Sequence, residues 1–236
     1  MASFLQELLV PYKIPFTKRR IGNQCDGGYI VFDKDLDKIS SLYSYGINND
    51  VSFELDFTRH SNAPIFMFDH TIEDIPLKHS NFHFIKEPGN TENIIKHINN
   101  TCPKNNKLIL KMDVEGCEWD ILSNLNKLVL CKFEQIMIEF HNLEFLEDHY
   151  FGNMGITYSK MINVFSKLNK YFYLGHIHGN NCGGRKDIPN TIECTYIRKD
   201  LINFIPEIEN KAYPISNLDY PNTPYAPDYI LDWWIK

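Results

Sequence analysis

Short apolar runs alternate with amphipathic stretches through the middle of this chain. Residues 91–98 and 158–168 place their apolar side chains three and four positions apart, which predicts helices with one buried face. Seven runs have the length and composition of β-strands, and they cover residues 42–45, 65–68, 82–85, 108–112, 136–140, 172–176 and 192–197. Strands that alternate with helices predict an α/β fold: a doubly wound, mostly parallel sheet with right-handed crossovers and helices on both faces.

The last two predicted strands are joined differently from the others. The joining segment, residues 178–189, has a loop-like composition with no helical pattern. A connection without a helix favours an antiparallel hairpin at the edge of the sheet. The pattern therefore predicts a seven-stranded sheet that ends in such a hairpin.

The most informative local feature is residues 108–122. An apolar run leads into an acidic turn that contains a glycine, and the turn opens into a helix carrying Trp119, Ile121 and Leu122. In open α/β sheets the ligand binds beyond the carboxyl ends of the strands. This position predicts that Asp113 and Glu115 lie at a functional site.

The chain has the length of one large domain. With 236 residues and 43% hydrophobic residues it can bury a single core. We expect one domain: an irregular N-terminal segment over residues 1–40, a core over 41–200 and a wrapping tail over 201–236. The tail is rich in Pro, Asn, Tyr and Trp, and we expect it to dock Trp233 and Trp234 on the core.

The net charge and the cysteines indicate which partners and which cellular compartment to expect. The formal net charge is −6, which argues against nucleic acid because phosphate neutralisation needs an excess of Lys and Arg. The only dense basic run, residues 18–20, is interpreted as a solvated patch. The six cysteines contain no Cys-x-x-Cys pair, which favours reduced thiols. No signal peptide or membrane-length run is expected, so we predict a soluble cytoplasmic protein without a membrane partner.

Short motifs along nearly the whole chain carry a family resemblance. They are Asp26-Gly-Gly-Tyr29, Tyr43-Ser-Tyr-Gly-Ile-Asn-Asn-Asp-Val-Ser-Phe-Glu54, Phe68-Asp-His-Thr71, Leu110-Lys-Met-Asp-Val-Glu-Gly-Cys-Glu-Trp119, Ile138-Glu-Phe-His141, His176-Ile-His-Gly-Asn-Asn181 and Leu218-Asp-Tyr-Pro-Asn222. Together they resemble the FkbM-like and methyltransferase-22-type families of S-adenosylmethionine-dependent enzymes. The resemblance implies the class I methyltransferase (Rossmann-like) fold. It also implies methyl transfer to a hydroxyl oxygen, with a carbohydrate or glycan as the acceptor.

The resemblance also implies where the cofactor binds. A glycine at position 46 lets the backbone approach the cofactor, and a carboxylate at position 69 is placed to accept hydrogen bonds from ribose hydroxyls. A plain strand-to-helix turn at Gly46 and a simple turn cap at Asp69 are the alternatives. The predicted cofactor-binding residues are Gly46, Asn48, Asp69, His70, Asp113 and Glu115.

Acceptor chemistry is predicted at the ends of later strands. Glu139 interrupts an apolar strand, where a carboxylate is costly unless it is paired. A histidine suits the role of base because its side chain titrates near neutral pH. His141 is predicted in preference to His178, because it ends the fifth predicted strand, where the acceptor should bind. Glu118 is interpreted as a solvated helix residue. The predicted catalytic residues are His141, Asp113 and His178, and the predicted substrate-binding residues are Glu139, Asn142 and Asn180.

Three alternatives stay open at this stage. Asp113, Glu139 and His141 form a candidate site for Mg²⁺ or Mn²⁺, which would acidify the acceptor hydroxyl. The acceptor is alternatively a protein or a small molecule. A non-catalytic nucleoside-binding module is the third. A hydrolase using the same Asp and His is disfavoured, since the Gly-x-Ser-x-Gly motif is missing.

Overall fold

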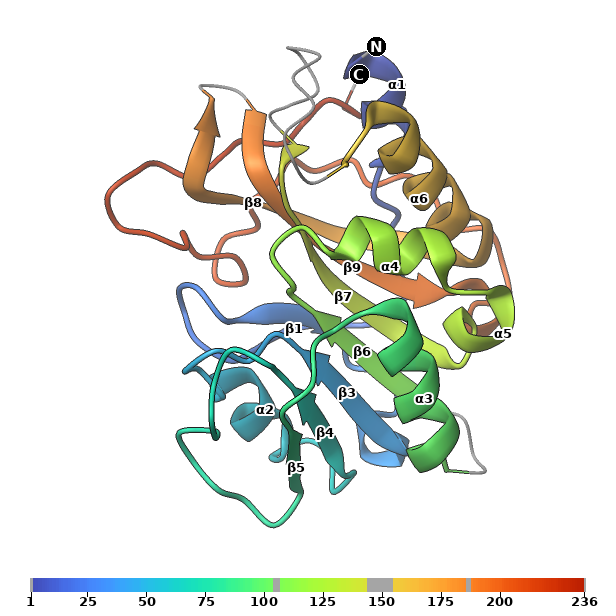
Figure 1. Cartoon of the computed structure of the whole chain (residues 1–236). Helices are drawn as coiled ribbons and strands as arrows, with labels where there is room; N and C mark the ends of the chain where they lie inside the picture. Colours follow the sequence, from blue (N-terminus) through green and yellow to red (C-terminus); the bar gives the residue numbers. More distant parts are fainter. Residues whose placement is uncertain (1, 104–106, 144–154, 186–187, 236) are drawn as a thin grey trace.

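A seven-stranded sheet forms the centre of the molecule, as the computed structural model of residues 2–103, 107–143, 155–185 and 188–235 shows (Figure 1). The strand order is β5-β4-β3-β6-β7-β9-β8. The strands are β3 (Ser41–Tyr45), β4 (Ile65–Phe68), β5 (Phe82–Ile85), β6 (Leu108–Met112), β7 (Phe133–Phe140), β8 (Phe172–Arg185) and β9 (Ile188–Arg198).

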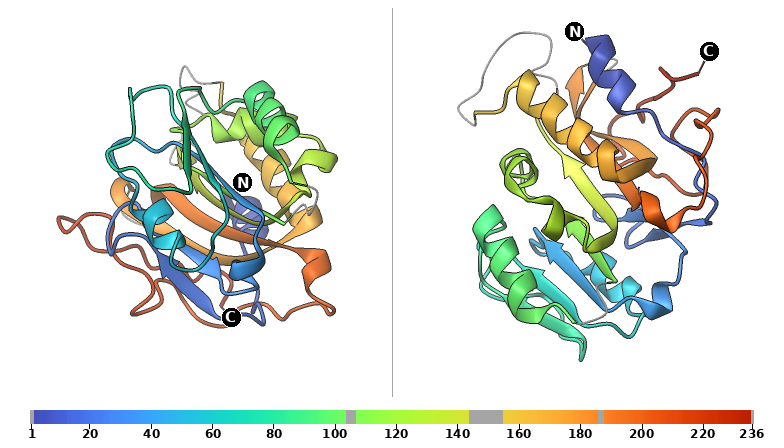
Figure 2. Two further views of the ribbon diagram at one scale, coloured as in Figure 1. Left: turned by 90° about the horizontal axis from the view of Figure 1, so that it is seen from below. Right: turned by 90° about the vertical axis from the view of Figure 1, so that its right-hand side faces the viewer.

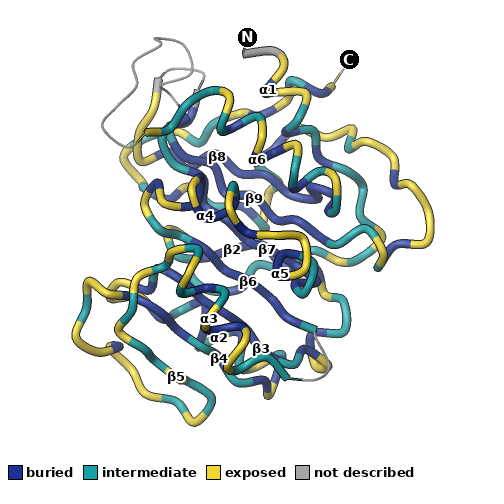
Figure 3. Tube along the Cα trace, turned by 45° about the vertical axis from the view of Figure 1, so that its right-hand side comes forward, coloured by how far each residue is buried: buried dark blue, intermediate teal, exposed yellow. Residues whose placement is uncertain are grey.

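Strands β3 to β7 are mutually parallel, whereas β9 runs antiparallel to both β7 and β8. Every residue of β3, β6 and β7 is buried, as expected for parallel strands covered on both faces (Figure 3). The predicted fold class, a mostly parallel seven-stranded α/β sheet with a terminal antiparallel hairpin, is confirmed.

One face of the sheet carries most of the helices. Trp119, Ile121 and Phe165 pack with the strand residues Leu110 and Phe140 in the larger apolar cluster. Figure 2 shows this row of helices along one side of the sheet. The helices on this face are α1 (Ala2–Leu8), α3 (Thr91–Thr101), α4 (Glu118–Asn124), α5 (Lys127–Leu130) and α6 (Tyr158–Tyr171).

The opposite face is covered by one helix, α2 (Ser52–Phe57), and by a second, two-stranded sheet. Its strands β1 (Lys18–Ile21) and β2 (Tyr29–Phe32) pair antiparallel. The prediction of an irregular segment is wrong here. Strand β2 is fully buried, and the Gln135 side chain of β7 bonds both the backbone N–H and the carbonyl of Phe32 at 2.8 Å. The contact with β7 therefore fixes β2, whose own sequence has little alternation of polar and apolar residues.

The basic run of residues 18–20 lies in β1. The interpretation as a solvated patch fits Arg19, which pairs with Asp33 at the surface, but is wrong for Lys18 and Arg20. Lys18 Nζ lies 2.6 Å from the Tyr213 hydroxyl, and burial lowers the pKa of Lys18 to about 8. Arg20 donates to the carbonyls of Asn23 and Cys25 at 2.6 and 2.7 Å. These cations therefore stabilise the tail and the β1–β2 turn.

The antiparallel hairpin is confirmed, but its strands are longer than predicted. Residues 178–189 were expected to form a loop, whereas Asn180 pairs with Thr191 and Gly184 with Pro189. Residues 186 and 187 of that segment lie outside the described residues. The register shifts between Leu174 and His176 and again between residues 180 and 184, so β8 does not follow a simple two-residue alternation.

The C-terminal tail, residues 206–235, crosses the edge of the sheet beside the N-terminal segment (Figures 1 and 2). His176 Nε2 lies 2.7 Å from the fully buried Asp219 carboxylate. Trp234 is buried against Tyr213, and the Trp233 indole donates to the carbonyl of Gln6 at 3.0 Å. None of the helices in the described part of the chain has both the length and the apolar character of a membrane span.

Candidate active site

A cavity of about 590 Å³ lies at the carboxyl ends of β3, β4 and β6. This is the edge where ligands bind in open α/β sheets, and the volume suits a small-molecule ligand. Its lining includes Asp26, Gly46, Asn48, Phe53, Asp69, His70, Gly89, Lys111, Asp113 and Glu115. All six predicted cofactor-binding residues therefore line one cavity.

Gly46 is required by the close approach of β3 to β6. Its φ is +78°, and a Cβ built at this position would lie 1.5 Å from the carbonyl oxygen of Asp113. The ammonium group of the buried Lys111 donates a hydrogen bond to the Gly46 carbonyl at 2.7 Å. The turn lines the cavity, and the predicted close approach of its backbone to the cofactor stays a prediction.

Asp69 fixes the two loops that follow β3 and β4. It accepts the N–H groups of Ile47 and Asn48 at 2.9 and 2.8 Å, and the N–H and hydroxyl of Thr71 at 2.7 and 2.6 Å. Burial opposes ionisation, but these hydrogen bonds hold the pKa of Asp69 below its ordinary value. Contact with a ribose remains a prediction. His70 follows it and is exposed beside the cavity.

Asp113 and Glu139 meet at the hydroxyl of Tyr29. This oxygen lies 3.2 Å from Asp113 Oδ2 and 3.0 Å from Glu139 Oε2. Burial, with the charges of Asp113 and Glu193, raises the pKa of Glu139 to about 8. A phenol has one proton to donate, so contact with both carboxyl groups needs a second proton, which Glu139 holds at neutral pH. Asn180 Nδ2 donates to the other Glu139 oxygen at 2.8 Å.

His141 follows β7 and lies among three carboxylates. Its Nε2 is 3.7 Å from Asp113 Oδ1 and 3.5 Å from Glu115 Oε2, and its Nδ1 is 3.3 Å from Glu118 Oε1. The same Glu118 oxygen accepts the backbone N–H of His141 at 2.7 Å, and the other accepts that of Gly116 at 2.8 Å. Glu118 is fully buried, so its interpretation as a solvated residue is wrong.

The surroundings of His141 determine its charge. Burial disfavours the cation, but the hydrogen bond to Glu118 and the charges of Glu118 and Asp113 outweigh it and raise the pKa to about 9. The imidazole is therefore protonated at neutral pH in the absence of a ligand. In that state it orients Asp113 as a cation and cannot accept a proton, which weakens the predicted base role.

Comparison with known proteins now identifies the family. The model of the Methyltransferase FkbM domain matches residues 13–173, more than two thirds of the chain. The chain belongs to the FkbM methyltransferase family. The resemblance inferred from the motifs is confirmed, and membership implies S-adenosylmethionine as the methyl donor.

Comparison with solved structures gives more distant similarities to this FkbM domain. Fibrillarin of Methanococcus jannaschii, a pre-rRNA processing protein, is similar in structure with a TM-score of 0.45 and 11% identity, over 70% of this chain and 69% of that chain. A structure of the fibrillarin/Nop5p complex gives a TM-score of 0.44 and 11% identity, over 70% and 74% of the two chains. Comparison with curated proteins gives no match.

The predicted acceptor residues are only partly brought together. Asn180 contacts Glu139, and Asn142 follows His141 with a φ of +67°. His178 is 1% exposed and does not line the cavity, since its nitrogens lie 3.2 Å from Glu193 and 3.1 Å from Asp228. Its predicted catalytic role has no support from this position.

Three residues around the FkbM site escaped the sequence analysis as functional candidates. Lys111 interrupts an apolar strand, the same signal that singled out Glu139, and its ammonium lies 5.3 Å from the Tyr29 ring centre. Tyr29 belongs to the Asp-Gly-Gly-Tyr motif, but only the β1–β2 fold shows that it reaches Asp113. Glu193 of β9 carries no local signal, because its partner in the pairing, Glu139, is 54 positions away.

The raised pKa values predict a loss of stability in mild alkali. The charged forms of His141 and His178, whose pKa values rise from 6.5 to about 9 and about 10, stabilise the fold fully below pH 6.5, and this contribution falls as pH rises. The raised pKa of Glu139 acts in the same direction. The lowered pKa values of His176, His97 and Lys18 oppose this change by a smaller amount. We expect urea unfolding to give a free energy about 4 kcal/mol lower at pH 8 than at pH 6.5.

The matched control for this pH effect is His178→Gln, which keeps a polar side chain but cannot become charged. We expect its unfolding free energy to depend less on pH over the same interval. Equal or greater stability of the unaltered protein at pH 8 would contradict the assignment of raised pKa values.

Proposed function

We propose that this protein is an S-adenosylmethionine-dependent O-methyltransferase whose acceptor is a hydroxyl of a sugar or glycan. The observation that carries the proposal is the cavity at the strand ends within an FkbM domain, which Gly46 and Asp113 line and where the buried Tyr29 hydroxyl joins Asp113 to Glu139. The carbohydrate acceptor is supported by the FkbM resemblance and by the polar side chains beside this cavity.

The chain's own residues fit the methyl donor. Gly46 and Asn48 supply backbone next to the cavity, and Asp69 holds that backbone in place. The exposed His70 and Glu115 line its rim. Asp113 supplies a negative charge at the end of β6, where a sulfonium cation would be stabilised. When bound, S-adenosylmethionine supplies an electrophilic methyl group.

Asp113 is the best-placed residue for the acceptor hydroxyl. Its side chain is partly exposed in the cavity, and the hydroxyl of Tyr29 and the His141 cation hold it from behind. In our proposal its carboxylate accepts the hydrogen bond of the acceptor hydroxyl and aligns that oxygen, which supplies much of the rate in a displacement reaction. The hydroxyl proton would pass to the Asp113 carboxylate along this hydrogen bond as the new C–O bond forms, because an alcohol is too weak an acid to ionise first; the donor, losing its methyl group, would leave as a neutral thioether.

The experiment that tests this function uses isotopically labelled S-adenosylmethionine and a panel of glycosides, with mass spectrometry of the products. A methyl ether on a sugar hydroxyl is the expected product. A label found only on protein or small-molecule amines would replace the acceptor class. Cofactor binding without any methylated product would favour the non-catalytic nucleoside-binding module.

We expect the reaction to proceed without a divalent metal. Asp113, Glu139 and His141 have ligand atoms within 4.8 Å of one another, but Tyr29 already bridges the first two. Two ligand atoms on opposite sides of one Mg²⁺ ion lie at most about 4.2 Å apart. Any two of these ligand atoms that are separated by more than this, up to 4.8 Å, would have to move closer to bind one ion. Activity should stay within about twofold after EDTA treatment and gel filtration. A tenfold loss that Mn²⁺ restores would instead assign a metal to these three residues.

The cysteines support a reducing compartment. All six, Cys25, Cys102, Cys117, Cys131, Cys182 and Cys194, are free thiols. We therefore propose a cytoplasmic location, where thiols stay reduced.

A further inference from the structure

Asp26 is fixed at the wall of the cavity by the turn between β1 and β2. It is exposed and lines the cavity. Gly27 follows with a φ of +83°, and a Cβ there would lie 2.3 Å from Asp50. A Cβ on Gly28 would lie 2.1 Å from the Asn23 carbonyl oxygen, which Arg20 binds. The turn therefore needs glycine at both positions, and it packs closely against Asp50 and the Asn23 carbonyl.

The Asp26 side chain is held from the C-terminal tail. Asn222 is buried, and its Nδ2 donates to Asp26 Oδ1 at 3.1 Å and to Glu193 Oε1 at 2.7 Å. These two carboxylates fix the orientation of the amide, because a flipped amide would turn its oxygen toward two negative charges. Asn222 thus connects an exposed cavity residue to a buried strand residue.

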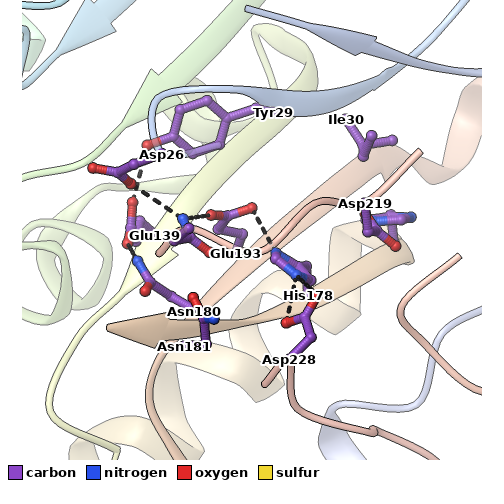
Figure 4. A network of polar contacts seen from close by, with 12 residues as sticks. Asp26, Tyr29, Ile30, Glu139, His178, Asn180, Asn181, Glu193, Asp219 and Asp228 are labelled. Atoms are coloured by element: carbon purple, nitrogen blue, oxygen red, sulfur yellow. Dashed lines mark hydrogen bonds and ion pairs between the residues drawn. The ribbon is translucent and has the colours of Figure 1, made fainter. Parts of the chain in front are cut away.

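Glu193 is itself held in place. His178 Nδ1 lies 3.2 Å from its Oε2, and His178 Nε2 lies 3.1 Å from both carboxylate oxygens of Asp228 (Figure 4). The network therefore runs from Asp26 through Asn222, Glu193 and His178 to Asp228. Its two ends lie on the β1–β2 turn and on the tail.

The network crosses the limit of the family match. The FkbM model ends at residue 173, so Asp26 lies inside it, whereas His178, Glu193, Asn222 and Asp228 lie beyond it. The cavity residues that serve the methyl donor lie within the matched region. The network that holds the Asp26 side chain thus comes from the part of the chain outside the matched domain. This is the part where we expect adaptation to a particular acceptor.

We propose that Asn222 is a positioning residue that holds Asp26 at the cavity wall, where the Asp26 carboxylate accepts a hydrogen bond from a hydroxyl of the acceptor. This inference rests on the proposed function, because it concerns the acceptor of that same site. It assigns His178 to the support of this network.

The test is a double-mutant cycle on the full chain, with the glycoside that the panel identifies as acceptor. Asn222→Ala should raise KM for the glycoside about tenfold while KM for S-adenosylmethionine and kcat stay within about twofold. Asp26→Ala should have a similar effect. In the Asp26→Ala background, Asn222→Ala should change the glycoside KM less than twofold, since the interaction it supports is already gone.

Asn210→Ala, at an exposed position of the same tail, is the matched control and should leave all constants unchanged. Asn222→Ser replaces the alanine variant if that variant does not fold. An unchanged glycoside KM in the Asn222 variant, or independent effects of the two substitutions, would overturn the inference and leave the proposed function intact. Failure of the unaltered protein to methylate any glycoside would instead reject the proposed acceptor class, and the inference with it.

Discussion

Asp113→Asn is expected to lower kcat for methyl transfer about 100- to 1,000-fold. The amide keeps the shape of the side chain but loses the charge that aligns the acceptor hydroxyl, and a positioned carboxylate contributes an effect of this size. The affinity for S-adenosylmethionine should fall much less, by about tenfold at most, because in our proposal other cavity residues also hold the cofactor. Single-turnover kinetics with labelled cofactor, alongside titration calorimetry, separates the two effects.

The control for this prediction is Asp120→Asn, the same chemical change on the exposed face of α4, where the carboxylate pairs with Lys160 at 2.8 Å. Its kcat should equal that of the unaltered protein. If Asp113→Asn keeps its kcat within threefold, Asp113 has no part in the chemistry, and another residue must align the acceptor.

Gly46→Ala is expected to destabilise the protein by more than about 3 kcal/mol and to abolish cofactor binding. The added Cβ would lie 1.5 Å from the Asp113 carbonyl oxygen, and the φ of +78° is unfavourable for alanine. Relief of this contact requires β3 and β6 to separate at the cavity. Urea unfolding and calorimetric titration with S-adenosylmethionine measure both effects.

Gly155→Ala separates the contact from the backbone conformation. Gly155 has a similar φ of +64°, but a Cβ there would meet no atom of the described residues within 4 Å. Only the conformational cost remains, about 1 kcal/mol. Equal losses of stability in the two variants would show that the close approach of the strands at Gly46 is unimportant.

Most of the fold that could be predicted followed from the pattern of hydrophobic residues along the chain. The strands that end at Tyr45, Phe68 and Met112 are apolar runs buried on both faces, and their order along the chain implied the parallel sheet. This in turn placed Gly46 and Asp113 beside one cavity. The β1–β2 sheet was missed because its stability comes from long-range contacts, such as that of Gln135 with Phe32, which have no local signature.

The electrostatics of the site was harder to predict than its location. Glu118 occupies the first turn of an amphipathic helix, where an acidic residue is ordinarily solvated. It is buried because the chain after β7 passes over it and donates the His141 N–H to its carboxylate. The same contact changes the expected behaviour of His141, since a buried anion at 3.3 Å makes the imidazole a cation. Sequence spacing does not report such a neighbour.

The contribution of the tail to the acceptor side has a consequence for biosynthesis. Residues 41–140 contain the five parallel strands and leave the ribosome well before Asn222 and Asp228 are translated. If domains fold as they emerge, a nascent chain can complete the cavity proposed for the methyl donor while Asp26 still lacks its partner. In our proposal, competence to select an acceptor would then arise only after Asn222 has emerged.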